Sequence, residues 1–129
     1  MKKIILDTNI LLLPSQQKID IFDEIDRICL FPYTLHIVDG TLTELKNIVE
    51  NQKGRQQDAA KLALAMLEKK KIQILKGENK HVDDDILAIA QPTTHIVATL
   101  DSDLKKKLNS KHIPLIMMRQ KKYLMLKDV

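Results

Sequence analysis

Four acidic segments of the sequence could act together in chemistry. Asp7 and Asp101 each end an apolar run, whereas Glu44 and the acidic triplet at residues 83–85 each stand in the first turn of an expected helix. Carboxylates gathered in one place repel one another and take up protons unless a cation neutralises them. An oxygen-only set without Cys or His favours Mg²⁺ or Mn²⁺ over zinc or copper. The acids therefore predict a site for a hard divalent cation.

Alternating apolar runs and amphipathic segments supply the elements that would bring these acids together. We expect strands at residues 3–6, 34–38, 72–75, 95–100 and 114–118, and residues 123–126 are a candidate for a short terminal strand. Helical spacing predicts helices at residues 16–30, from 41 onward, and at 57–69, 86–90 and 102–109. Parallel strands need crossover connections, so this alternation predicts a three-layer α/β/α fold around a central, mostly parallel five-stranded sheet.

In that fold the acidic segments meet at the carboxyl edge of the sheet, where open α/β proteins bind their ligands. Each acid also has a purely structural interpretation. Asp7 could cap the following loop, Thr41 and Glu44 fit a capping box, and Asp84 could stabilise a helix N-terminus. Their coincidence at one edge favours the cation site over several independent caps.

The composition narrows the class of protein and its partners. With 129 residues, the chain is expected to form one domain, residues 1–129. No apolar run is long enough for a membrane span, and Asp7 comes too early for a signal peptide, so we expect a cytoplasmic protein without a membrane partner. The net charge is +4 and basic residues concentrate in the C-terminal half, which favours a polyanion such as RNA. The expected RNA contacts are Lys105, Lys106, Lys107, Arg119, Lys121 and Lys122.

These motifs also carry a family resemblance that covers the whole chain in order. The segments concerned are Asp7-Thr8-Asn9, Thr43-Glu44-Leu45, Val82-Asp83-Asp84 before Ile86-Leu87-Ala88, and the stretch from Val97 to Leu104. They resemble the four acidic motifs of PIN domains. The doubled Asp83-Asp84 and the segments around Asp101 and Arg119 resemble archaeal and eukaryotic proteins of small-subunit ribosomal RNA processing more than the VapC toxins.

The resemblance implies a metal-dependent endoribonuclease that uses Mg²⁺ or Mn²⁺. Matched by position, its metal-binding acids are Asp7, Glu44, Asp84 and Asp101, with Asp103 as an auxiliary and with Asn9 and Thr99 as polar supports. The family spacing suits Asp84 best within the triplet, while Asp83 remains able to reach the metal and Asp85 should point away. Precursor ribosomal RNA, ribosome-assembly proteins and a second copy of the chain, docked through the helix at 57–69, are the implied partners.

Other functions remain open or fit less well. A catalytically silent RNA-binding or scaffold subunit of a ribonucleoprotein would keep this fold, and a VapC-type toxin ribonuclease would keep both fold and acids. A haloacid-dehalogenase-type phosphatase needs a second Asp two residues after the first, where this chain has Asn9. A nucleotide-binding fold needs a glycine-rich loop, whereas the three glycines stand far apart.

Overall fold

The computed structural model describes residues 1–78 and 81–128, and its strands form a six-stranded sheet in the order β3-β2-β1-β4-β5-β6. The strands are β1 (Lys2–Leu6), β2 (Tyr33–Val38), β3 (Gln73–Leu75), β4 (His95–Ala98), β5 (Leu115–Arg119) and β6 (Tyr123–Lys127). Neighbouring strands from β3 to β5 are parallel, and β6 runs antiparallel beside β5. The predicted, mostly parallel sheet is confirmed, and the candidate terminal strand extends it from five strands to six.

The outer strand β6 is held at its exposed edge by the helix α3 (Ile21–Ile28). Arg27 donates from Nη2 to the carbonyl oxygen of Leu124 (2.9 Å), and the amide of Leu124 donates to Oε1 of Glu24 (2.9 Å). These bonds satisfy backbone groups that an edge strand would otherwise present to other chains.

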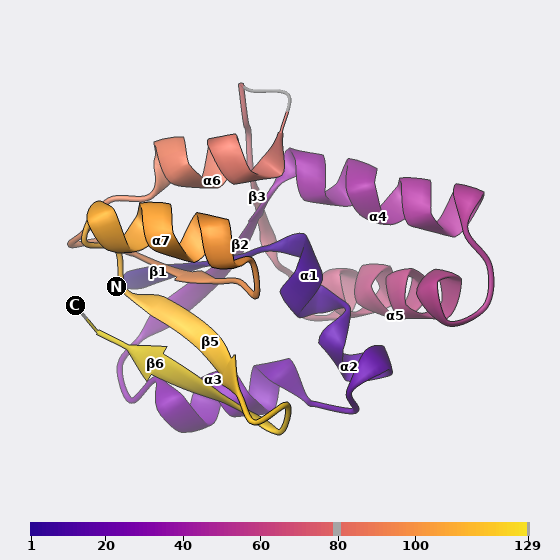
Figure 1. The fold of residues 1–129 in the computed structure, drawn as a ribbon, viewed down its shortest axis with the longest axis horizontal. Coiled ribbons are helices and arrows are strands. Elements are labelled where there is room, and N and C mark those ends of the chain that lie inside the picture. Colours follow the sequence, from indigo (N-terminus) through magenta and orange to yellow (C-terminus); the bar gives the residue numbers. More distant parts are fainter. Residues whose placement is uncertain (79–80, 129) are drawn as a thin grey trace.

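Helices cover both faces of the sheet, as Figure 1 shows. Beside α3 they are α1 (Thr8–Leu11), α2 (Leu13–Gln16), α4 (Asp39–Asn51), α5 (Arg55–Lys69), α6 (Val82–Ile89) and α7 (Ser102–Ser110). Successive strand residues point to opposite faces, so β1 contributes to two cores. Ile5 packs with residues of α6 and α7, whereas Ile4 packs with residues of α1 to α5. The three-layer prediction is therefore confirmed.

Several predicted elements have different bounds in the structure, and the helix predicted at residues 86–90 is α6, which already begins at Val82. The helix predicted at residues 16–30 is shorter, because Asp20 caps α3 by accepting a hydrogen bond from Asp23 N (3.0 Å). Gln16 ends α2 instead, and residues 17–20 are not helical. The strand predicted at 95–100 ends at Ala98, because Thr99 and Leu100 use polar groups to build the loop described below.

None of the helices in the described ranges combines the length and apolar content that a bilayer crossing needs.

Candidate active site

Asp7 lies where β1 ends and α1 begins. Its carboxylate accepts hydrogen bonds from Thr8 N (2.8 Å) and from the hydroxyl of Thr99 (2.6 Å), and only 4 % of the residue is exposed. The first bond caps α1, as the structural interpretation of Asp7 predicted. The second bond is not needed for a cap and fixes the carboxylate in a buried position.

Thr99 and Asn9 join the segment after β4 to the segment after β1. The fully buried Thr99 hydroxyl donates to Asp7 and accepts from Asp101 N (3.0 Å). The side-chain oxygen of Asn9 accepts from Leu100 N (3.1 Å). Both predicted supports therefore connect the chain segments that carry Asp7 and Asp101.

Asp101 caps α7 at the same edge of the sheet. Its Oδ1 accepts hydrogen bonds from Asp103 N (2.9 Å) and Leu104 N (3.1 Å). Asp103, the predicted auxiliary acid, lies exposed in the first turn of α7 and contacts Asp101 through its backbone amide.

Glu44 reaches the site from α4 and is held by the segment after β1. The hydroxyl of Thr8 donates to Oε1 of Glu44 (2.5 Å), and it lies 3.3 Å from the hydroxyl of the fully buried Thr41. The predicted capping box of Thr41 and Glu44 is wrong. The helix already begins at Asp39, so both residues lie inside α4, and its N-cap residue makes no side-chain cap bond.

The acidic triplet at the start of α6 is divided between two hollows of the surface. Asp83 lines a hollow together with Glu44, whereas Asp84 lines a groove between α6 and α7 beside Lys107. Asp85 is only 3 % exposed, accepts a hydrogen bond from Glu78 N (3.0 Å) and lines the same hollow as Asp83, so its pointing away from the other acids stays a prediction. The placement differs from the prediction in that Asp83 rather than Asp84 lies toward the other acids.

The backbone at Gly77 approaches Asp85 very closely. An ideal Cβ on this glycine would lie 1.9 Å from Oδ2 of Asp85, much less than any real contact. Only glycine allows this approach, which holds Asp85 beside the loop that follows β3.

Electrostatic repulsion connects the acids across these elements. Burial raises the pKa of Asp7 above its usual range, the hydrogen bonds from Thr99 and Thr8 oppose that rise, and the charges of Asp83 and Glu44 add to it. Burial also raises the pKa of Asp83, and the charges of Asp101 and Glu44 are the next causes. The charges of Glu44 and Asp101 therefore act on the buried carboxyls of Asp7 and Asp83, and this negative environment disfavours the ionised forms of Asp7 and Asp83.

The donor chemistry of this environment suits a hard cation, because it consists of carboxylate and hydroxyl oxygens. Within residues 1–78 and 81–128, however, no three acidic, His or Cys side chains already stand close enough to hold an ion. Glu44 and Asp101 are instead engaged with the Thr8 hydroxyl and with amides of α7. A bound cation would have to draw these carboxylates toward it.

Comparison with known proteins assigns the chain to a family. A family model described as a PIN like domain matches residues 4–121. The chain belongs to this PIN-like family. The predicted resemblance is therefore confirmed.

Relatives of this PIN domain include both a named ribonuclease and solved structures. Ribonuclease VapC4 of Methanocaldococcus jannaschii is 34% identical over an alignment of 126 residues, and the match covers 95% of each chain. The PIN domain endonuclease Utp24 has the same fold, with a TM-score of 0.77, 23% identity and coverage of 98% of this chain and 92% of that one. A domain of a functionally unknown protein from Methanocaldococcus jannaschii is also similar, with a TM-score of 0.64, 16% identity and 92% of each chain covered.

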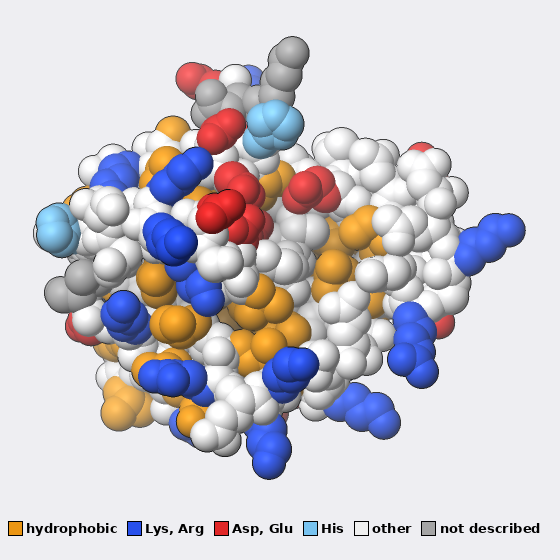
Figure 2. All heavy atoms as spheres, viewed as in Figure 1, with side chains coloured by type: hydrophobic (Ala, Val, Ile, Leu, Met, Phe, Trp, Pro, Cys, Tyr) orange, Lys and Arg blue, Asp and Glu red, His pale blue; other side chains and the backbone are white. Residues whose placement is uncertain are grey.

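Basic side chains border the acids of the PIN domain. Figure 2 shows acidic side chains grouped on one face, with Lys and Arg side chains beside and below them. Lys107 acts on Asp83 directly, since its charge lowers the pKa of that carboxyl against the effect of burial. Lys105 is half-buried, and the other predicted RNA contacts are exposed: Lys106, Lys107, Arg119, Lys121 and Lys122.

The sequence did not predict the roles of Thr8 and Thr41 in the site. Thr8 supports two acids at once, because its amide donates to Asp7 and its hydroxyl donates to Glu44. Its position directly after Asp7 was a signal for the first bond. The second bond joins residues 36 positions apart, and only the packing of α4 against α1 could reveal it.

Proposed function

We propose that this chain is a divalent-metal-dependent endoribonuclease whose metal site is formed by Asp7, Glu44, Asp83 and Asp101. The observation that carries the proposal is the shared electrostatic environment of these acids, where burial and mutual repulsion raise the pKa of Asp7 and Asp83. Such an arrangement is unfavourable without a counter-charge. Membership of the PIN-like family and the 34% identity to Ribonuclease VapC4 support a nuclease that acts on RNA.

The protein's own part in hydrolysis is to position charge. Bound Mg²⁺ or Mn²⁺ would supply an activated water and neutralise the negative charge that develops on the phosphate. Thr99 and Thr8 fix the carboxylate of Asp7, and the amides of α7 orient Asp101. Water adds to phosphorus, one P–O ester bond breaks, and the departing oxygen takes a proton. The acids bind and orient, and none of them forms a bond to phosphorus.

The RNA backbone must be held by groups outside the acids, because the acids repel phosphate. Lys107 is well placed to bind phosphate, because it lines the groove between α6 and α7 and its charge also acts on the carboxyl of Asp83. The remaining basic residues of α7 and of the β5–β6 turn would extend the contact by counterion release.

Two substrate classes follow from different observations. The motifs around Asp83 and Asp101 resemble ribosomal RNA processing proteins, which favours a structured ribosomal precursor. The identity to Ribonuclease VapC4 favours a VapC-type toxin ribonuclease. Incubation with ribosomal precursor RNA beside an unrelated structured RNA of equal length separates them, because a processing enzyme should cut the precursor at defined positions and spare the other.

The decisive test compares acid-to-amide variants of similar shape. Asp83→Asn should reduce Mn²⁺-dependent cleavage by more than about 100-fold, since even indirect supports of metal ligands often contribute that much. Asp84→Asn is the matched control in the neighbouring position and should retain most of the activity. Asp7→Asn and Asp101→Asn should behave like Asp83→Asn. Full activity of Asp7→Asn would refute the metal site. Inactivity of Asp84→Asn together with activity of Asp83→Asn would show that Asp84, as the family spacing predicts, is the metal ligand in place of Asp83.

The main rival is a catalytically silent subunit that binds RNA with the same basic surface. The acids distinguish the two, because a silent subunit has no need of a cation. Calorimetric titration of the wild-type protein with Mn²⁺ should give binding that Asp7→Asn abolishes. Absence of Mn²⁺ binding together with tight RNA binding would favour the silent subunit.

A further inference from the structure

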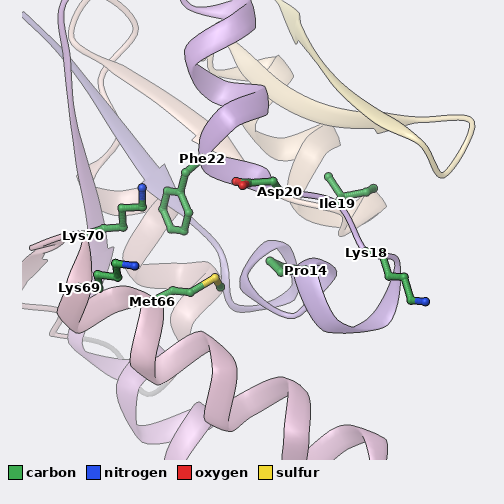
Figure 3. Close-up of a pocket in the computed structure, with 8 residues that line it drawn as sticks. All are labelled: Pro14, Lys18, Ile19, Asp20, Phe22, Met66, Lys69 and Lys70. Carbon is green, nitrogen blue, oxygen red and sulfur yellow. The ribbon is translucent and has the colours of Figure 1, made fainter.

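A basic hollow lies between α2, the start of α3 and the end of α5, and it shares no residue with the acidic site. We call it the α2–α5 pocket. Its volume is about 480 Å³. Figure 3 shows Lys69 and Lys70 on one side of it and Lys18 on the other, with Pro14, Phe22 and Met66 between them.

One of the three lysines is held in place by an aromatic ring. Nζ of Lys70 lies 5.4 Å from the centroid of the Phe22 ring, within the range of a cation–π interaction. Phe22 is only 7 % exposed and packs in the core, so the ring is a fixed support. A cation held this way loses less conformational freedom on binding an anion than an unsupported lysine does.

The rest of the lining combines apolar surface with one engaged acid. Pro14 and Met66 are half-buried and leave apolar atoms at the surface of the pocket. Asp20 is the acid in the lining, and its Oδ1 accepts the capping hydrogen bond from Asp23 N. The lining therefore contains three lysines and one acid, which leaves the pocket with a net positive charge.

We propose that the α2–α5 pocket binds a phosphorylated nucleoside, with the phosphate beside Lys69 and Lys70 and the base against Pro14 and Met66. A volume of about 480 Å³ lies within the range of small-ligand sites. The two neighbouring cations Lys69 and Lys70 on one side of the hollow match the compact charge of a phosphate. An acidic peptide would instead need cations spaced along an extended path.

The phosphorylated nucleoside has two sources, a free nucleotide or one unit of an RNA strand. The second source rests on the proposed ribonuclease function, since the pocket would then hold a strand whose other part lies at the acids. The first source does not depend on it.

The test uses AMP as the probe, in EDTA, so that the acidic site holds no metal and repels phosphate. Binding is followed by amide chemical shifts and by calorimetry on the full chain. AMP should shift the amides of Phe22, Lys69 and Lys70. The double variant Lys69→Gln/Lys70→Gln should bind about tenfold more weakly, because it removes two exposed charge contacts with the phosphate.

The matched control is Lys53→Gln/Lys61→Gln, which removes the same charge from exposed positions outside the pocket and should bind AMP like the wild type. Equal weakening in both double variants, or no shift of the three amides at millimolar AMP, would overturn the proposal. Tighter binding of hexaglutamate than of AMP would overturn it in favour of an acidic protein partner.

The source is decided by cleavage kinetics on two RNAs. If the pocket holds part of a strand, Lys69→Gln/Lys70→Gln raises KM for a long RNA and leaves kcat/KM for a trinucleotide unchanged. If the pocket holds a free nucleotide, the same variant leaves KM for the long RNA and kcat/KM for the trinucleotide unchanged, while its AMP binding is weaker. A wild-type protein that binds AMP in the pocket but cleaves no RNA would refute the proposed function and leave the pocket assignment standing.

Discussion

Replacing Thr99 by Val tests whether the buried hydroxyl holds the site together. Thr99 is fully buried, donates to Oδ2 of Asp7 (2.6 Å) and accepts from Asp101 N (3.0 Å). Valine keeps the branched shape and removes both bonds. The Asp7 carboxylate then loses a donor in a place where water has little access, and the amide of Asp101 loses its acceptor.

The expected loss of stability follows from these two bonds. A hydrogen bond to a charged group contributes about 1.5–3 kcal/mol, and a neutral one about 1 kcal/mol. The sum, allowing for partial relaxation, is about 2–4 kcal/mol. With an unfolding entropy of about 2.1 cal/mol/K per residue, a chain of 129 residues should lose roughly 7–15 °C in Tm.

The measurement is thermal and urea unfolding in EDTA, with Thr99→Ser as the matched control. Serine keeps the hydroxyl and loses one buried methyl group, so it should cost about 1 kcal/mol. The Thr99 bond lowers the pKa of Asp7, so the deficit of Thr99→Val should also shrink at acidic pH, where Asp7 takes up a proton. A Thr99→Val protein as stable as Thr99→Ser would refute the reasoning.

Three further predictions concern metal, pH and RNA. A 100-fold excess of Mn²⁺ over its Kd should stabilise the fold by about 2.7 kcal/mol in thermal melts, and an unchanged Tm would contradict a genuine site. Burial lowers the pKa of His36 and His95, and the charge of Lys3 lowers both further, so the folded state binds fewer protons than the unfolded state. Stability should therefore fall as the pH drops below about 6.5, by at most about 1.4 kcal/mol per pH unit for each histidine, and His36→Gln should flatten this slope in urea melts. Removing three phosphate contacts should make the fall of log K for RNA binding with log salt less steep, by about 2 in slope. Unchanged slopes in both triple Ala variants would place the RNA elsewhere on the surface. Those variants replace Lys105, Lys106 and Lys107, or Arg119, Lys121 and Lys122.

The layered fold could be predicted because it depends on patterns that the chain repeats. Each strand of the parallel sheet is a short apolar run, and helical segments separate the runs, so class and strand sequence follow from periodicity. Helix boundaries depended on single polar contacts instead. Asp20 starts α3 by capping it, and nothing in the spacing of apolar residues distinguishes that cap from a position inside a longer helix.

The general location of the acids could be predicted for the same reason, since the ends of parallel strands share one edge. The supporting contacts are different in kind. The bond from Thr8 to Glu44 depends on how α4 packs beside α1, and the Thr99 bond depends on the register between β1 and β4. Residue types allow such bonds, but only the assembled layers select them.

The acidic triplet shows why residue spacing alone could not decide the register. Successive residues of a helix point about 100° apart, so only one of three consecutive aspartates can face a given neighbour. The rotation of α6 is fixed by what it buries, and its buried residues are Val82, Asp85 and Ile86. With Asp85 turned toward the loop at Gly77, Asp83 comes to the side of Glu44 and Asp84 to the side of α7. An aspartate is rarely found in the buried face of a helix, so the burial of Asp85 could not be expected from the sequence. Unless Asp85 is known to be buried, the rotation of α6 is undetermined, and Asp84 could lie beside the other acids as readily as Asp83.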